Sequence, residues 1–225
     1  MIKPNRSLRI VAGAALALGN LFAMSLGARA QEGTDDKLAE TLIREGRLEQ
    51  NIIACSLCHS ETGQGDVNFG FGNLTGQSEA YIADQLHAFK AGERENKVMQ
   101  RISKSLSERD IAALSAYYSK MKVAGAAFAV NKVPEVGLKL ATKGDEAREI
   151  PACDSCHGLD ADTGDLAIAN INGQHSTYII NQLVSWQDGG RDPESVMAQI
   201  APKLSVPEIN ALAIYYASRT RKAKE

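Results

Sequence analysis

The chain has 225 residues, of which 44% are apolar and 23% are charged, a composition typical of a globular protein and not of a disordered or fibrous one. This length permits one domain or two. The formal net charge of −2 argues against nucleic acid as a partner, because nucleic-acid-binding proteins usually carry a strong basic excess.

Residues 1–30 have the order of features of a secretory signal peptide. An apolar run from Ile10 to about Leu26 precedes a cleavage signal, Ala28-Arg29-Ala30, and follows three basic residues, Lys3, Arg6 and Arg9. A retained membrane anchor is the alternative, but the run is diluted by small and polar residues and falls short of the roughly 20 apolar residues of a spanning helix. We expect cleavage after Ala30 and a soluble periplasmic protein.

Cleavage would make the protein more acidic. The signal peptide carries four of the 25 basic residues and no acidic residue, so 21 basic residues would remain against 27 acidic ones, a net charge of −6. Such a charge suits basic docking surfaces on protein partners better than it suits nucleic acid.

The mature sequence is a tandem duplication. A Cys-x-x-Cys-His motif at residues 55–59 recurs 98 residues later at 153–157, and further matches lie 97 or 98 residues apart. They include Gly46 and Gly144, Gln77 and Gln174, Tyr81 and Tyr178, Gln85 and Gln182, Arg94 and Arg191, Met99 and Met197, and Tyr117-Tyr118 and Tyr215-Tyr216. We therefore expect two homologous domains, residues 31–128 and 129–225.

Apolar residues at helical spacing predict the same set of helices in each unit. In the first unit these cover residues 36–47, residues 79–91 and a segment that begins after Ser107 with a capping-box pattern. The glycine-rich residues 63–76 are expected to form an irregular loop. No run of alternating or β-branched residues is convincing, so the predicted fold class is all-α.

The Cys-x-x-Cys-His motif is the attachment signature of c-type haem. Two cysteines on one helical turn bind the haem covalently through sulfur, and the following histidine is the proximal iron ligand. The predicted covalent sites are Cys55, Cys58, Cys153 and Cys156, and the predicted iron ligands are His59 and His157. The alternatives are a thioredoxin-like redox pair, which needs a β-α-β setting, a zinc site, which needs four converging ligands, and simple disulfides, which would not require the repeated histidine.

Methionine is the expected ligand on the other side of each iron, since a haem that only transfers electrons has both axial positions filled. Met99 and Met197 each follow their histidine by 40 residues, whereas Met121 matches Arg219 and so has no counterpart. Core packing is the alternative role for the matched pair. His87 and His175 are not repeated, because Val184 and Ser78 occupy the matching positions, and we expect both histidines to be incidental or on the surface.

Together these features resemble the cytochrome c4 family, whose members are tandem di-haem proteins built from two class I cytochrome c folds. The resemblance covers the mature chain and rests on both haem motifs, the repeated Gly-Gln, Gln-Leu and Gly-x-Arg segments, the two methionines and the Tyr-Tyr endings. It implies two covalently bound haem c groups. It also implies that the first and last helices of each unit cross with a glycine against an aromatic ring, for which Gly46 with Tyr117 or Tyr118, and Gly144 with Tyr215 or Tyr216, are the matching candidates.

The resemblance further suggests that Arg94 and Arg191 lie near the haems, where a guanidinium group pairs with a propionate. A role as surface arginines is the alternative. The chain departs from the family in two respects: neither 60–78 nor 158–176 contains the proline whose carbonyl usually accepts the histidine N–H, and Ser60 replaces a common glycine that Gly158 retains. The group that orients each histidine is therefore left open.

The expected function is electron transfer and not catalysis. The resemblance implies a donor such as a membrane quinol-oxidising complex and an acceptor such as a terminal oxidase, with peripheral membrane association through these partners. The alternative is a cytochrome subunit of a periplasmic dehydrogenase that oxidises sulfide or other sulfur compounds. A peroxidase is disfavoured, because it needs a displaceable iron ligand and both methionines are present.

Overall fold

The computed structural model describes residues 33–122, 132–159 and 167–220, and all the regular structure in these ranges is helical. Extended pairing in these ranges is confined to three isolated bridges. The all-α prediction is confirmed. The expected signal peptide and the boundary between 128 and 129 lie outside the described residues. Within the described ranges, no helix has the length and apolar character needed to cross a membrane.

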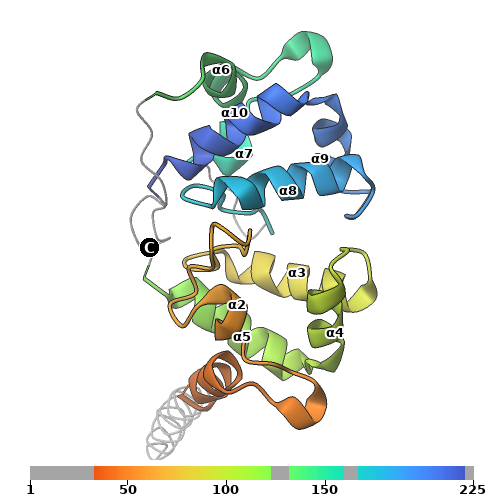
Figure 1. The fold of residues 1–225 in the computed structure, drawn as a ribbon. Helices are drawn as coiled ribbons and strands as arrows, with labels where there is room; N and C mark the ends of the chain where they lie inside the picture. The colour runs from red at the N-terminus through yellow and green to blue at the C-terminus, as the bar shows by residue number, and fades with distance from the viewer. Residues whose placement is uncertain (1–32, 123–131, 160–166, 221–225) are drawn as a thin grey trace, which may run out of the picture.

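Two helical units follow one another along the chain (Figure 1). The first begins with a helix over residues 33–44 and continues through η1 (Leu48–Gln50), α2 (Ser56–His59), α3 (Glu79–Ala91), α4 (Lys97–Ser105) and α5 (Glu108–Lys120). The second contains α6 (Glu135–Lys143), η2 (Glu146–Arg148), α7 (Asp154–His157), α8 (Ser176–Gln187), α9 (Val196–Ile200), η3 (Ala201–Lys203) and α10 (Val206–Ala217). The order of elements is thus repeated, and α3 and α8 run along the level where the units meet.

The helix ends follow from local sequence. The Ser78 side chain accepts a hydrogen bond from the amide of Tyr81 at the start of α3, and Gly92 ends that helix in a left-handed conformation with φ 89°. At α5 the predicted capping box is present, formed by Ser107 and Asp110, and α10 begins with the equivalent box. The predicted helix over residues 79–91 and the helix start after Ser107 are confirmed.

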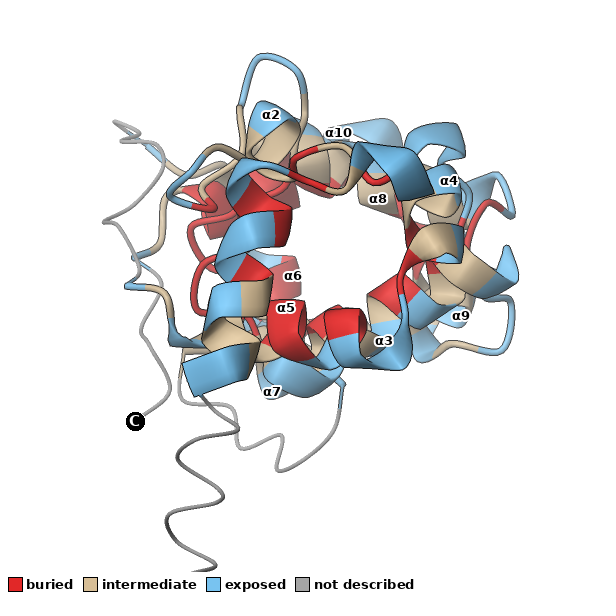
Figure 2. Cartoon of the chain, turned by 90° about the horizontal axis from the view of Figure 1, so that it is seen from below, coloured by how far each residue is buried: buried red, intermediate tan, exposed pale blue. Residues whose placement is uncertain are grey.

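Each unit has its own apolar core. The first core joins the helix at residues 33–44 to α3 and α5, and the second joins α6 to α8 and α10. Figure 2 shows buried residues on the sides of α3, α5 and α6 that face into the units. The fully buried side chains at the two centres are equivalent in the repeat: Leu42 and Leu140, Ile52 and Ile150, and Ile111 and Ile209.

In the second unit the first and last helices, α6 and α10, do pack against each other, but Gly46 and Gly144 are not the crossing glycines. Gly46 and Gly144 both have positive φ, and a Cβ there would meet the carbonyl oxygen of Ile52 or Ile150, so these residues are turn glycines. The close helix contact lies instead at Gly137 in α6, where an added Cβ would be 2.5 Å from the carbonyl oxygen of Ala211 in α10. Residue 137 is a glycine within a helix because the backbones of α6 and α10 approach too closely there for a side chain.

Candidate functional site

The two Cys-x-x-Cys-His motifs fold as single helical turns. Each turn closes with the histidine amide donating to the first cysteine's carbonyl, at 2.9 Å from His59 to Cys55 and 2.8 Å from His157 to Cys153. No disulfide joins the four cysteines. The simple-disulfide alternative is therefore not what the fold forms, and the two cysteines of each turn are placed together for covalent attachment.

Two backbone carbonyls orient the motif histidines in the absence of the loop proline. Nδ1 of His59 donates to the carbonyl oxygen of Gly72 at 3.0 Å, and Nδ1 of His157 donates to that of Ala169 at 2.8 Å. Because a carbonyl can only accept, the proton is on Nδ1 and the Nε2 lone pair is available to a metal. Gly72 and Ala169 are 97 residues apart, so this arrangement is itself repeated.

Burial also keeps both imidazoles neutral. It lowers the pKa of His59 and of His157 below the ordinary histidine value, and the carbonyl hydrogen bond opposes this effect only in part. A neutral imidazole is the form that binds iron. The geometry and the protonation state thus suit both histidines to the predicted role of axial ligand.

The environment of the first cysteine in each motif is unlike that of a redox-active thiol. Burial raises the pKa of Cys55 and of Cys153 to about 11, whereas nucleophilic Cys-x-x-Cys pairs have a lowered pKa. Within the described residues, no group of three or more His, Cys, Asp or Glu side chains is placed to hold a metal ion. Covalent haem attachment is the role that fits the surroundings of these cysteines.

The matched methionines lie on the same cores as the attachment cysteines. Met99, in the first turn of α4, and Cys55 are partly buried against the first core, and Met197, in α9, and Cys153 are partly buried against the second. The unmatched Met121 also packs on the first core. Iron ligation by Met99 and Met197 therefore stays a prediction.

The two unmatched histidines differ from each other. His87 is half exposed and pairs with Glu108 at 2.7 Å, as expected for a surface residue. His175 is not incidental: its Nε2 donates to the carbonyl oxygen of Gln64 at 2.7 Å and so joins the second unit to the haem loop of the first.

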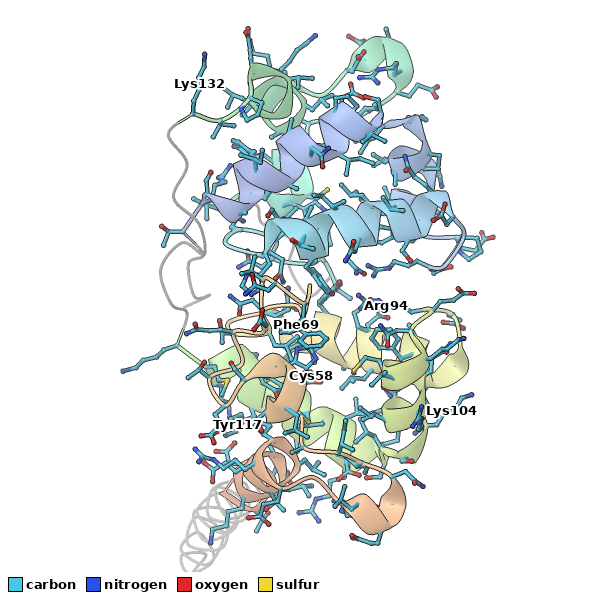
Figure 3. The ribbon with its side chains drawn as sticks, viewed as in Figure 1. Cys58, Phe69, Arg94, Lys104, Tyr117 and Lys132 are labelled. Carbon is cyan, nitrogen blue, oxygen red and sulfur yellow. The ribbon has the colours of Figure 1, made fainter. Side chains whose placement is uncertain are left out.

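Arg94 and Arg191 are 6% and 7% exposed, so the surface-arginine alternative is wrong. Figure 3 places Arg94 at the level where the two units meet. Each guanidinium group bonds to a glutamine of both units: Oε1 of Gln85 accepts from Arg94 at 2.8 Å and from Arg191 at 2.6 Å, and Oε1 of Gln182 accepts from Arg191 at 2.9 Å and from Arg94 at 2.6 Å. Arg94 also donates to the hydroxyl of Tyr178.

These arginines are a test of whether the chain suits a haem. Arg94 lies over the Phe89 ring and Arg191 over the Trp186 ring, and their hydrogen-bond partners among the described residues are neutral oxygens. Two buried positive charges that share neutral partners favour a nearby anion, because burying unpaired charge is costly. The carboxylates of haem propionates are such anions.

Sequence reasoning missed two further polar sets. Gln77 and Gln174 were recognised only as repeat matches, yet each bonds to the backbone of an asparagine in the other unit, Asn170 or Asn73. The available signal was that the same polar residue, glutamine, occurs at this position in both repeats. The second set surrounds Asp154, whose matching residue in the first unit is Ser56. That difference between the repeats was the only sequence signal for this set.

Asp154 is inside the second attachment turn and accepts three hydrogen bonds. Tyr215 and Tyr216 donate to its two carboxylate oxygens at 2.8 Å each, and Arg219 donates at 2.9 Å. Burial raises the pKa of Tyr215 to about 12, and the hydrogen bond to Asp154 adds to this effect. The phenols therefore remain protonated donors.

No protein-family model matches the chain, but individual relatives do. A thiosulfate dehydrogenase electron acceptor of Stutzerimonas stutzeri (strain A1501) is 32% identical over 209 residues, which cover 91% of this chain and 95% of the relative. A protein of the same description from Thiomonas intermedia (strain K12) is 36% identical, with 74% and 78% covered. Cytochrome c4 of Pseudomonas aeruginosa is 32% identical, with 74% and 84% covered.

Solved structures of similar proteins have the same fold. The thiosulfate dehydrogenase TsdBA of Marichromatium purpuratum aligns with a TM-score of 0.74 and 36% identity over 82% of this chain, which spans 40% of that longer chain. Cytochrome c4 of Pseudomonas stutzeri aligns with a TM-score of 0.66 and 29% identity over 73% of this chain and 93% of that one. The repeated helical units, the oriented histidines, the paired cysteines and these relatives agree: the chain belongs to the cytochrome c4 family, and it is an electron-transfer protein with two covalently bound haem c groups and not an enzyme.

Proposed function

We propose that this chain is the periplasmic electron acceptor of a thiosulfate dehydrogenase. The observation that carries the proposal is the near full-length match to a relative described by that function, which covers 91% of this chain and 95% of the relative. The structure neighbour with a TM-score of 0.74 is also described as a thiosulfate dehydrogenase. The proposed location requires export, for which the signal peptide at residues 1–30 and cleavage after Ala30 are proposed.

The proposed domains are residues 31–128 and 129–225, with one haem each. In the first, Cys55 and Cys58 hold the haem covalently and His59 and Met99 are the axial ligands. In the second, these roles belong to Cys153, Cys156, His157 and Met197. The support is the hydrogen-bonded, neutral state of both histidines and the position of each methionine on the core that its attachment cysteine borders.

Each residue group has a defined task in electron transfer. A haem held by each attachment turn would supply an iron that changes between ferric and ferrous forms, and so a site for one electron. The carbonyls of Gly72 and Ala169 hold the imidazoles in one tautomer and orientation, which reduces the rearrangement that accompanies a change of iron charge. Arg94 and Arg191 are suited to neutralise propionates between the units.

Two one-electron centres match the stoichiometry of thiosulfate oxidation. When two thiosulfate ions join through a new S–S bond, two electrons leave and no atom is gained or lost. The dehydrogenase carries out this chemistry, and the cytochrome removes the electrons. One turnover would therefore reduce both haems of one molecule.

The test is to mix the oxidised holo-cytochrome with the purified catalytic subunit of a thiosulfate dehydrogenase and to add thiosulfate under anaerobic conditions. We expect rapid reduction of both haems, followed by their visible absorption, and no reduction when the catalytic subunit is left out. Failure of the complete mixture to reduce a cytochrome that dithionite reduces would overturn the proposal. A haem count by the pyridine haemochrome method, with spectra of the axial ligands, tests the site assignment separately.

A second candidate is a carrier between a quinol-oxidising complex and a terminal oxidase. It is favoured by the relatives described as cytochrome c4, such as that of Pseudomonas aeruginosa. In this case, membranes that contain the quinol-oxidising complex would reduce the protein faster than thiosulfate dehydrogenase does.

A further inference from the structure

The two haem attachment turns differ in charge. In the second unit, the Asp154 carboxylate pairs with the Arg219 guanidinium group at 2.9 Å, with side chains that are 23% and 20% exposed. Asp154 directly follows the attachment residue Cys153. Arg219 also lies over the Tyr215 ring, 4.9 Å from its centroid. This ion pair is held by two phenols and an aromatic face, and Asp154 lies in the same helical turn as Cys156 and His157.

The first unit has no ionic group at these positions. Ser56 matches Asp154, and Met121 matches Arg219. The tyrosines are present in both units but have different partners: Tyr117 donates to Glu40 at 3.3 Å, and the buried Tyr118 lies beside the Cys55 thiol. The chain therefore repeats the tyrosine pair and adds a carboxylate and a guanidinium group only in the second unit.

We propose that the Asp154–Arg219 ion pair sets the reduction potential of the second haem independently of the first. The proposal rests on the presence of two haems and not on the identity of the redox partner. Reduction adds one negative charge to the haem, so a nearby carboxylate opposes reduction and a nearby guanidinium group favours it. The intact pair combines these opposing effects, and the two phenols keep the carboxylate in place.

The opposing effects give the variants opposite signs. In Asp154→Ser, Arg219 is left without its carboxylate, and the potential of the second haem should rise. In Arg219→Met, Asp154 is left without its guanidinium group, and the potential should fall. Each change should alter the ratio of reduced to oxidised second haem by about tenfold at a given applied potential, which is about 59 mV for one electron. The double variant has the residues of the first unit, and the potential of its second haem should move towards that of the first.

The experiment is a redox titration of the holo-protein in which the haem methyl resonances in NMR spectra follow the two haems separately. Asp154→Asn is the second variant, for use if the serine variant does not fold. It removes the carboxylate charge but retains an oxygen that can accept a hydrogen bond from a tyrosine. Glu208→Gln is the matched control. It removes a carboxylate paired with Arg148 in the same unit, but Glu208 and Arg219 are separated by 11 residues along α10 and the chain that follows, about 16 Å on a helical path.

Opposite shifts confined to the second haem, with a smaller shift in Glu208→Gln, support the proposal. It is overturned if a folded variant with unchanged axial-ligand spectra leaves the second potential unmoved. It is likewise overturned if the two single variants shift the potential in the same direction, or if both haems shift equally. None of these outcomes depends on thiosulfate dehydrogenase, so they are separate from the test of the proposed function.

Discussion

Replacement of Gln77 by alanine should loosen the contact between the two units. The Gln77 side chain is 5% exposed, and its Oε1 accepts from the amide of Asn170 at 2.7 Å while its Nε2 donates to the Asn170 carbonyl oxygen at 3.1 Å. Alanine removes both bonds. A typical hydrogen bond contributes about 1 kcal/mol to stability, and a buried group left without a partner costs about 1–3 kcal/mol. Since Asn170 is only partly buried and water can reach it, we expect a total loss of about 2 kcal/mol.

The direct assay is amide hydrogen exchange of Asn170 in the holo-protein. A loss of about 2 kcal/mol corresponds to roughly thirtyfold faster exchange where local opening controls the rate. Gln199→Ala is the matched control, because it makes the same truncation at an exposed position of the second unit and should leave this exchange unchanged. Unchanged protection of Asn170 in Gln77→Ala would refute the assignment of these bonds to the interface.

A double-mutant cycle extends this test to the equivalent side chain. Gln174 is 4% exposed and bonds to the amide and carbonyl of Asn73 at 2.8 and 3.0 Å. Because both glutamines hold one contact, the second substitution should cost less once the first has separated the units. Fully additive losses in the free energy of unfolding would show that each glutamine acts only within its own surroundings.

Three other predictions concern the separate units. Gly137→Ala should lower the urea midpoint of the second unit, because overpacking costs about 1–3 kcal/mol and exceeds the gain of about 1 kcal/mol in helix propensity. The Arg148 hydrogen bond holds the pKa of Glu208 at about 2, below its ordinary 4.5. This ion pair therefore stabilises the folded state fully above pH 4.5, and the stabilisation is lost as the pH falls through about 2. Glu208→Gln should lower the free energy of unfolding by about 1 kcal/mol at pH 7 and by little at pH 2, as measured in urea titrations. Replacing Cys55 and Cys58 together by alanine should leave the first unit largely unfolded by NMR, and a well-folded, haem-free first unit would contradict this.

Sequence patterns predicted the features that depend on neighbouring residues. The helix over residues 79–91 and the capping box at Ser107 are local, since propensity and capping act within a few positions. The carbonyls that orient the histidines were not predicted, because a loop carbonyl carries no sequence signal once the usual proline is absent. Gly72 and Ala169 could be found only from the loop conformation.

The helix crossing was misassigned for a different physical reason. A glycine can be required by a left-handed turn or by close approach of two backbones, and sequence alone does not separate the two. Gly46 and Gly144 serve the first purpose and Gly137 the second. The useful signal was position: Gly137 is within a helical segment, where glycine costs about 1 kcal/mol relative to alanine unless a contact requires it.

The arginines and glutamines between the units are arranged as in a symmetric dimer, although they lie within one chain. Arg94 bonds to Gln182 and Arg191 bonds to Gln85, so each pair is the repeat equivalent of the other, as in an isologous interface. This arginine–glutamine set treats both units alike and cannot by itself give the haems different potentials. A difference must then arise where the repeat is broken, and the described residue that breaks it inside an attachment turn with a charge is Asp154. If electrons flow in one direction through this protein, a departure from the duplication and not the duplicated interface must set that direction.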